Sequence, residues 1–159
     1  MTLPNPAALH HTAFVVRDLE KTARALKMSL GIGPWNIWTL EPTELKVRGV
    51  ASRQSFKIGL ATIGGGTYEL ISPVTGSGLY DEQLATKGEG FHHTCVAYQA
   101  VADLRAVKSA QVAEGREVIQ EGGMGDVFEF VYIMFPELGS AVELLYLDAD
   151  KLPPPDAVI

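Results

Sequence analysis

The chain has 159 residues, of which 47% are hydrophobic and 20% are charged, and its formal net charge is −6. These values fit a single globular domain, and the acidic balance argues against a nucleic acid partner, which needs concentrated Lys and Arg. The sequence has no apolar run of the roughly 18 residues that a transmembrane helix needs and no apolar signal sequence at its start. With Cys95 as its single cysteine, it has no internal disulfide, and we expect a cytoplasmic protein.

The first half of the chain predicts one strand, one helix and then several strands. Residues 11–17 have the β-branched and aromatic content of a buried strand. Asp18 suits the N-cap of a helix over about 19–30, and Gly31 suits the left-handed residue that follows a helix end. Further strands are expected near 35–41, 44–51, 55–63 and 67–72, and a short helix near 79–87.

The second half predicts the same order of elements. The expected elements are a strand at 92–98, a helix over about 100–114, and strands near 116–121, 127–135 and 141–147. Successive prolines lack the N–H donor of a regular strand, so residues 149–159 are expected to form an extended tail. The 1–159 domain is therefore divided into a first module at about 9–73, a linker at about 74–90 and a second module at about 91–148.

An internal repeat supports this division into two modules. Residues 10–16 read HHTAFVV and residues 92–98 read HHTCVAY, and each half later places one acidic residue within an apolar strand. These acidic residues are Glu69 in TYELISP and Glu143 in SAVELLYL. A repeat of this length indicates two copies of one structural unit.

The repeat also places four potential metal ligands at matching positions. Because strand side chains alternate between faces, His11, Glu69, His93 and Glu143 are each expected among small or apolar neighbours. A lone Glu in such a strand usually pairs with Lys or Arg, and a lone His usually belongs to the core. Two matching His and Glu pairs instead favour a divalent metal, because two imidazoles and two carboxylates suit Zn, Co, Ni, Mn or Fe. The preceding histidines, His10 and His92, remain alternative ligands.

Four segments resemble the vicinal-oxygen-chelate superfamily, closest to its methylmalonyl-CoA epimerase-like and glyoxalase-like branch. They are HHTAFVVRDLEKTARAL, FKIGLATIGGGTYELISP, KGEGFHHT and SAVELLY, and the similarity spans about residues 9–147. The resemblance implies an α+β fold in which two βαβββ modules form a half-open barrel around one metal ion. It also implies that His11, Glu69, His93 and Glu143 are the ligands and that the protein is a homodimer.

The resemblance and the donor set together predict a metal-dependent isomerase or lyase. Such a site removes a proton next to a carbonyl through a metal-stabilised enolate, with Glu143 as the first candidate for the base and Glu69 as the second. The expected substrate is a small molecule with two neighbouring oxygens, such as an acyl-CoA or another carbonyl compound.

Four further residues are expected near the substrate pocket: Trp35, Trp38, Lys57 and Cys95. Two alternative functions accompany the main prediction. An Fe(II) extradiol dioxygenase would use two His and one carboxylate as ligands. A binding protein for antibiotics or other small molecules would use the same fold without a reaction, with aromatic side chains stacking on the ligand.

Overall fold

The computed structural model describes residues 2–159, so the first residue of the expected 1–159 domain lies outside this range. The chain divides into two compact units. We call the first the N-terminal unit; it comprises His11–Glu41, Arg53–His92 and Pro153–Ile159. We call the second the C-terminal unit; it comprises the described part of Met1–His10 together with Pro42–Ser52 and His93–Leu152.

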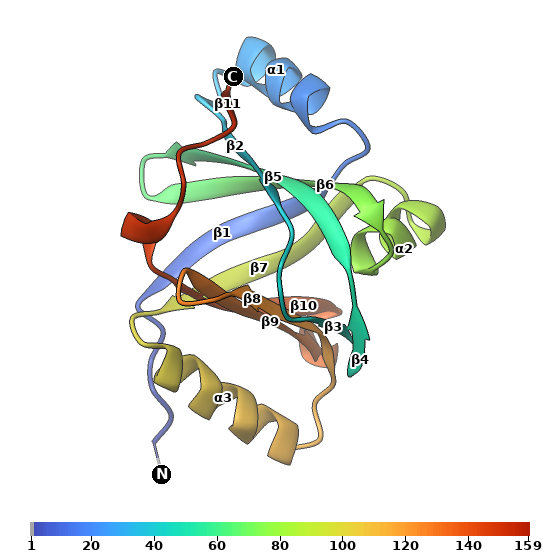
Figure 1. Ribbon diagram of the computed structural model, residues 1–159. Helices are drawn as coiled ribbons and strands as arrows, with labels where there is room; N and C mark the ends of the chain where they lie inside the picture. Colours follow the sequence, from blue (N-terminus) through green and yellow to red (C-terminus); the bar gives the residue numbers. More distant parts are fainter. Residues whose placement is uncertain (1) are drawn as a thin grey trace. The chain divides into compact units, whose positions relative to one another are not determined.

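The N-terminal unit contains a βαβββ module with a short added strand. Its strands follow the order β11-β2-β5-β6-β1 in the sheet (Figure 1). Strand β1 (Ala8–Val15), whose first residues belong to the C-terminal unit, runs parallel to β6 (Gly66–Gly76). The remaining elements are α1 (Leu19–Leu30), β2 (Asn36–Leu40), β5 (Gln54–Ile63), α2 (Leu79–Thr86) and β11 (Ala157–Val158).

Helix α1 begins and ends where the sequence predicts. The Asp18 side chain accepts a hydrogen bond from the Lys21 backbone N–H at 3.0 Å, and Gly31 follows the helix with a φ of 71°. The helix packs against the sheet through a cluster that contains Leu19 and Ala23 from α1 and Ile37, Ala61 and Leu70 from the strands. Burial of this apolar stripe therefore holds the helix on one face of the sheet.

The C-terminal unit repeats the module and adds a hairpin to its edge. Its strands follow the order β7-β10-β9-β8-β3-β4, and β7 (Gly90–Tyr98) runs parallel to β10 (Ser140–Leu147). The other elements are β3 (Leu45–Val47), β4 (Val50–Ser52), α3 (Val101–Ala113), β8 (Val118–Met124), β9 (Phe128–Phe135) and two short 3-10 helices at Pro136–Leu138 and Ala149–Lys151. These two modules confirm the expected α+β fold class.

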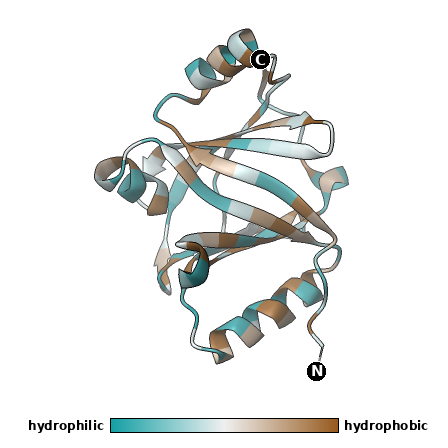
Figure 2. Ribbon diagram, turned by 180° about the vertical axis from the view of Figure 1, so that it is seen from behind, coloured by the Kyte–Doolittle hydropathy of each residue, from teal (hydrophilic) through white to brown (hydrophobic). Residues whose placement is uncertain are grey.

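Helix α3 covers one face of the C-terminal sheet. Hydrophilic and hydrophobic residues alternate along it (Figure 2), and its buried Leu104 and Val107 pack against Val131, Ile133 and Leu144 of β9 and β10. No helix within residues 2–159 combines the length and apolar character that membrane crossing requires.

Two segments differ from the sequence expectations. The strand expected at 44–51 is a hairpin, because Arg48 and Gly49 both have positive φ values, 47° and 78°, and turn the chain between β3 and β4. Strand β3 of this hairpin pairs with β8 in the C-terminal unit, although its sequence lies in the first half of the chain. The tail also ends in a strand: β11 pairs with β2, and the Trp35 N–H donates to the Ile159 carbonyl at 2.8 Å.

Candidate metal site

The N-terminal unit holds a buried His–Glu pair on two adjacent parallel strands. Glu69 of β6 pairs in register with Ala13 of β1, two residues after His11. The Nε2 atom of His11 lies 3.1 Å from Oε2 of Glu69, and the two side chains are 3% and 9% exposed. A carboxylate this deeply buried needs a partner, because desolvation of its charge is costly.

The C-terminal unit holds a second pair with the same relationship between strands. Glu143 of β10 pairs in register with Cys95 of β7, two residues after His93. The Nε2 atom of His93 lies 3.0 Å from Oε2 of Glu143, and the side chains are 0% and 7% exposed. The sequence repeat is thus also a repeat in strand register, with His and Glu occupying equivalent positions in each unit.

The chemistry of these pairs fits a divalent metal. Each of the four side chains offers one atom that can bind a metal ion, and each is buried. Imidazole nitrogen and carboxylate oxygen together suit Zn and the neighbouring divalent transition metals. In each pair, the His Nε2 atom and a Glu carboxylate oxygen already lie close together. These are the two atoms that would bind a cation.

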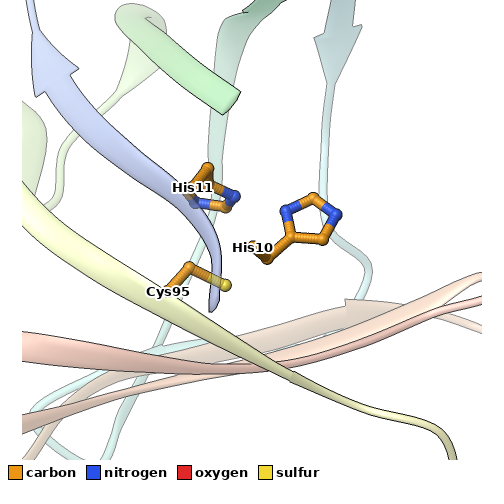
Figure 3. Close-up of side chains that lie close together, drawn as sticks. All are labelled: His10, His11 and Cys95. Atoms are coloured by element: carbon orange, nitrogen blue, oxygen red, sulfur yellow. The ribbon is translucent and has the colours of Figure 1, made fainter. Parts of the chain in front are cut away.

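The second histidine of each HH motif, not the first, faces the carboxylate. Figure 3 shows His10, His11 and Cys95 close together, and one possible ligand atom of each lies within 4.8 Å of the others. His11 is the histidine whose Nε2 atom lies beside the Glu69 carboxylate. His10 is half-buried, and the His92 ring packs against Tyr80 with ring centroids 5.3 Å apart. The side-chain alternation of the two strands therefore favours His11 and His93 over the preceding histidines as ligands.

Two of the expected pocket residues share a sheet face with the His–Glu pairs. Cys95 is fully buried, and its register partner Glu143 lies on the same face of the C-terminal sheet. Trp38 pairs with Ile58, which pairs with Ile71, two residues beyond Glu69. The Trp38 ring therefore lies on the face that carries Glu69, and its Nε1 donates to the Pro153 carbonyl at 2.9 Å.

The structure corrects the expectation for the other two pocket residues. Trp35 is fully buried in the cluster under α1, and its Nε1 donates to the Ile32 carbonyl at 2.7 Å, so it has no surface for a ligand. Lys57 lies on the face of β5 that α1 covers, opposite to the face of Glu69, and its Nζ forms an ion pair with Glu20 of α1. Both corrections have the same reason, because both side chains lie on the side of the sheet that α1 covers.

Sequence reasoning missed two buried polar residues beside Glu143. Tyr132 of β9 is the register partner of Glu143 on the side opposite to Cys95, and Gln120 of β8 is the register partner of Tyr132. Tyr132 is 3% exposed and Gln120 is fully buried. Tyr132 lies in the apolar run FVYIMF, which indicates an ordinary core strand. Only the pairing of β8, β9 and β10 brings these residues into one row with Glu143.

A protein-family comparison agrees with this architecture. The model of the Glyoxalase/Bleomycin resistance protein/Dioxygenase superfamily matches residues 10–135, which include most of β1, both histidines of the two pairs and Glu69, and which end before β10 and Glu143. No curated protein matches the chain in a sequence search.

Several solved structures share the fold at low sequence identity. A hypothetical protein from Bacillus halodurans is 17% identical, with a TM-score of 0.66 over 92% of this chain and 98% of that one. Methylmalonyl-CoA epimerase from Streptomyces coelicolor, in complex with 2-nitronate-propionyl-CoA, is 20% identical, with a TM-score of 0.62 over 94% and 100% of the two chains. The corresponding epimerase from Mycobacterium tuberculosis is 14% identical, with a TM-score of 0.61 over 94% of each chain. Identities in this range establish the fold alone.

Proposed function

Because the chain belongs to the Glyoxalase/Bleomycin resistance protein/Dioxygenase superfamily, we propose that His11, Glu69, His93 and Glu143 together bind one divalent metal ion. The observation that carries this proposal is the repeated pair: each unit buries one imidazole against one carboxylate in the same strand register. Two carboxylates balance the charge of a divalent cation, and two neutral imidazoles complete an N2O2 donor set. Zn, Co, Ni, Mn and Fe are the candidate metals.

The proposed reaction is proton transfer next to a carbonyl group, in the isomerase or lyase class. The bound ion supplies a Lewis acid that stabilises negative charge on two neighbouring substrate oxygens. Glu143 takes the proton, and Glu69 is the second candidate for this role, since a carboxylate beside the reacting carbon is within reach of its proton. Return of the proton to the other face of the same carbon gives epimerisation, and return to the neighbouring carbon gives isomerisation.

The low exposure of both pairs supports this chemistry. The two glutamate side chains are 9% exposed or less, and a site sheltered from water strengthens every charge interaction inside it.

The remaining parts of the proposal concern the substrate, the oligomeric state and the cellular location of the protein. The substrate is a carbonyl compound with vicinal oxygens, for which acyl-CoA thioesters are the first class to test because one structural relative is complexed with such a ligand. The protein acts as a homodimer in the cytoplasm.

The first experiment measures metal in the untagged protein by elemental analysis. We expect about one divalent transition metal per chain in the wild type and a loss of it in Glu143→Ala, while the exposed Glu117→Ala serves as the control. Iron as the metal would favour the dioxygenase. A protein that takes up no metal after incubation with divalent ions would contradict the proposed site and favour a small-molecule binding protein.

A second experiment tests the reaction class. Deuterium exchange next to the carbonyl, followed by proton NMR in heavy water, reports proton removal from 2-substituted acyl-CoA thioesters and glutathione hemithioacetals. We expect exchange that depends on added metal and on Glu143. Exchange by the Glu143→Gln variant at the wild-type rate would contradict the role of Glu143 as the base.

A further inference from the structure

The ring of Tyr132 packs against the imidazole of His93 inside the C-terminal unit. The two ring centroids lie 4.6 Å apart, and the ring planes are tilted by 38°. Tyr132 also stands directly across from Glu143 in the pairing of β9 with β10. His93 therefore meets Glu143 through its Nε2 atom and Tyr132 through its ring face.

These two contacts restrain different motions of the imidazole. A hydrogen bond at Nε2 fixes the position of one atom but permits the ring to tilt about it. A ring packed against the imidazole face opposes that tilt, because the tilt would open a void between the two rings. His93, Tyr132 and Glu143 are each 5% exposed or less as whole residues, so little solvent is available to replace the lost contact.

A comparison of the two modules shows what Tyr132 adds beside Glu143. The position across from Glu69 in the N-terminal unit is Leu60, on the paired strand β5. Leu60 and Tyr132 thus occupy equivalent places beside the two glutamates, but only Tyr132 offers an aromatic face. The two His–Glu pairs are equivalent in register and different in their side-chain support.

We propose that Tyr132 is a positioning residue of the metal site, whose ring holds the His93 imidazole in the orientation that presents Nε2 beside the Glu143 carboxylate. The inference rests on the proposed metal-binding function and adds a residue to it. Residues that orient a metal-binding His without touching the metal typically change metal affinity by about 10- to 100-fold when they are replaced. The ring contact carries this proposed role, so the Tyr132→Phe variant, which keeps the ring, should retain it.

Three variants separate this role from general packing. Tyr132→Leu installs the residue that the repeat has at the equivalent place, Tyr132→Phe keeps the ring, and Tyr98→Leu removes another buried ring of the same unit from the sheet face that α3 covers. Zinc affinity is measured for each by competition with a chromophoric chelator, and the visible spectrum of the cobalt form reports the ligand geometry. Circular dichroism of each metal-free variant confirms that it is folded.

We expect Tyr132→Leu to lower zinc affinity by about 10- to 100-fold and to alter the cobalt spectrum, while Tyr132→Phe stays close to wild type. An unchanged affinity in Tyr132→Leu would overturn the inference, as would an equal loss in Tyr98→Leu. A readout without metal is the NMR cross-peak between the Tyr132 and His93 ring protons in the metal-free protein, and its absence would also overturn the inference. If the cross-peak is present and the wild type binds no metal, the proposed function fails while the packing role of Tyr132 stands.

Discussion

The Nε2 atom of His93 lies 3.0 Å from the Oε2 atom of Glu143, and the two side chains are 0% and 7% exposed. The residues are 50 positions apart in the sequence and reach each other because β7 and β10 are adjacent parallel strands. In the metal site proposed above, a close approach of this kind would serve two purposes. It places both donor atoms together before the ion arrives, and it shields them from water, so that less of the binding free energy is spent on ordering the ligands.

Divalent metal should stabilise the folded protein through both glutamates. A ligand that binds only the folded state raises the free energy of unfolding by about 2.7 kcal/mol at 100 times its dissociation constant. We therefore expect excess zinc to raise the melting temperature of the wild type and to have a smaller effect on Glu69→Gln and Glu143→Gln. Differential scanning calorimetry with and without zinc measures this, with the exposed Glu117→Gln as control. Equal zinc effects in all four proteins would contradict the four-ligand site.

The two tryptophans should differ strongly in their effect on stability. Trp35 is fully buried and Trp38 is partly exposed, so removal of the Trp35 side chain leaves the larger cavity. We expect Trp35→Ala to lower the free energy of unfolding by about 3–5 kcal/mol and Trp38→Ala to lower it by less. Urea denaturation measures both, and Trp35→Phe provides a milder variant if the alanine variant does not fold. An equal loss for the two tryptophans would contradict the full burial of Trp35 under α1 and the partial exposure of Trp38.

The N-termini of helices α1 and α3 allow the contribution of an N-cap side chain to be tested, by its removal in α1 and by its addition in α3. Asp18 caps α1 through its side chain, whereas Ala100 stands at the N-cap of α3 and has no side-chain group for this bond. We expect Asp18→Ala to lower the free energy of unfolding by about 1 kcal/mol and Ala100→Ser to raise it by up to about 1 kcal/mol. Thermal unfolding followed by circular dichroism checks both changes, and Asp18→Ser should remain close to wild type. A stabilising Asp18→Ala substitution would refute the capping role.

The ion pair between Lys57 and Glu20 should give a pH-dependent contribution to stability. The hydrogen bond from Lys57 holds the pKa of the Glu20 carboxyl below its usual range, and partial burial opposes this shift. Because the folded-state pKa is lowered, the contribution is present above the usual glutamate pKa and is lost as the pH falls through the lowered value.

We therefore expect Lys57→Met to lower the free energy of unfolding by about 0.5–1 kcal/mol near neutral pH, since both side chains are about one-third exposed. Urea denaturation from about pH 7 to about pH 3 should show the wild type and the variant converging as Glu20 becomes protonated. The Glu20→Gln variant removes the other charge of the ion pair, so its free energy of unfolding should lose the same pH dependence. A constant difference between wild type and Lys57→Met across this range would show that the pair contributes by packing alone.

Local patterns in the sequence predicted most elements and the identity of the paired residues. The strand pattern around His11 and His93, the N-cap residue Asp18 and the glycine after α1 each act through neighbouring residues, so they can be recognised without tertiary structure. The two-fold repeat extended this local information, because a residue that is ambiguous in one module has a counterpart in the other. Strand alternation then placed each glutamate among apolar neighbours.

Only the tertiary structure decided which residues stand beside the pairs. The position of Tyr132 across from Glu143 depends on the register of β9 against β10, and a shift of one residue would turn the ring to the other face. Lys57 and Trp35 were misplaced for the same reason, because the sequence does not specify which face of a strand a helix covers. The hairpin around Gly49 pairs with β8, which follows it by about 70 residues. Such non-local pairing depends on hydrogen bonds between strand edges that no local pattern records.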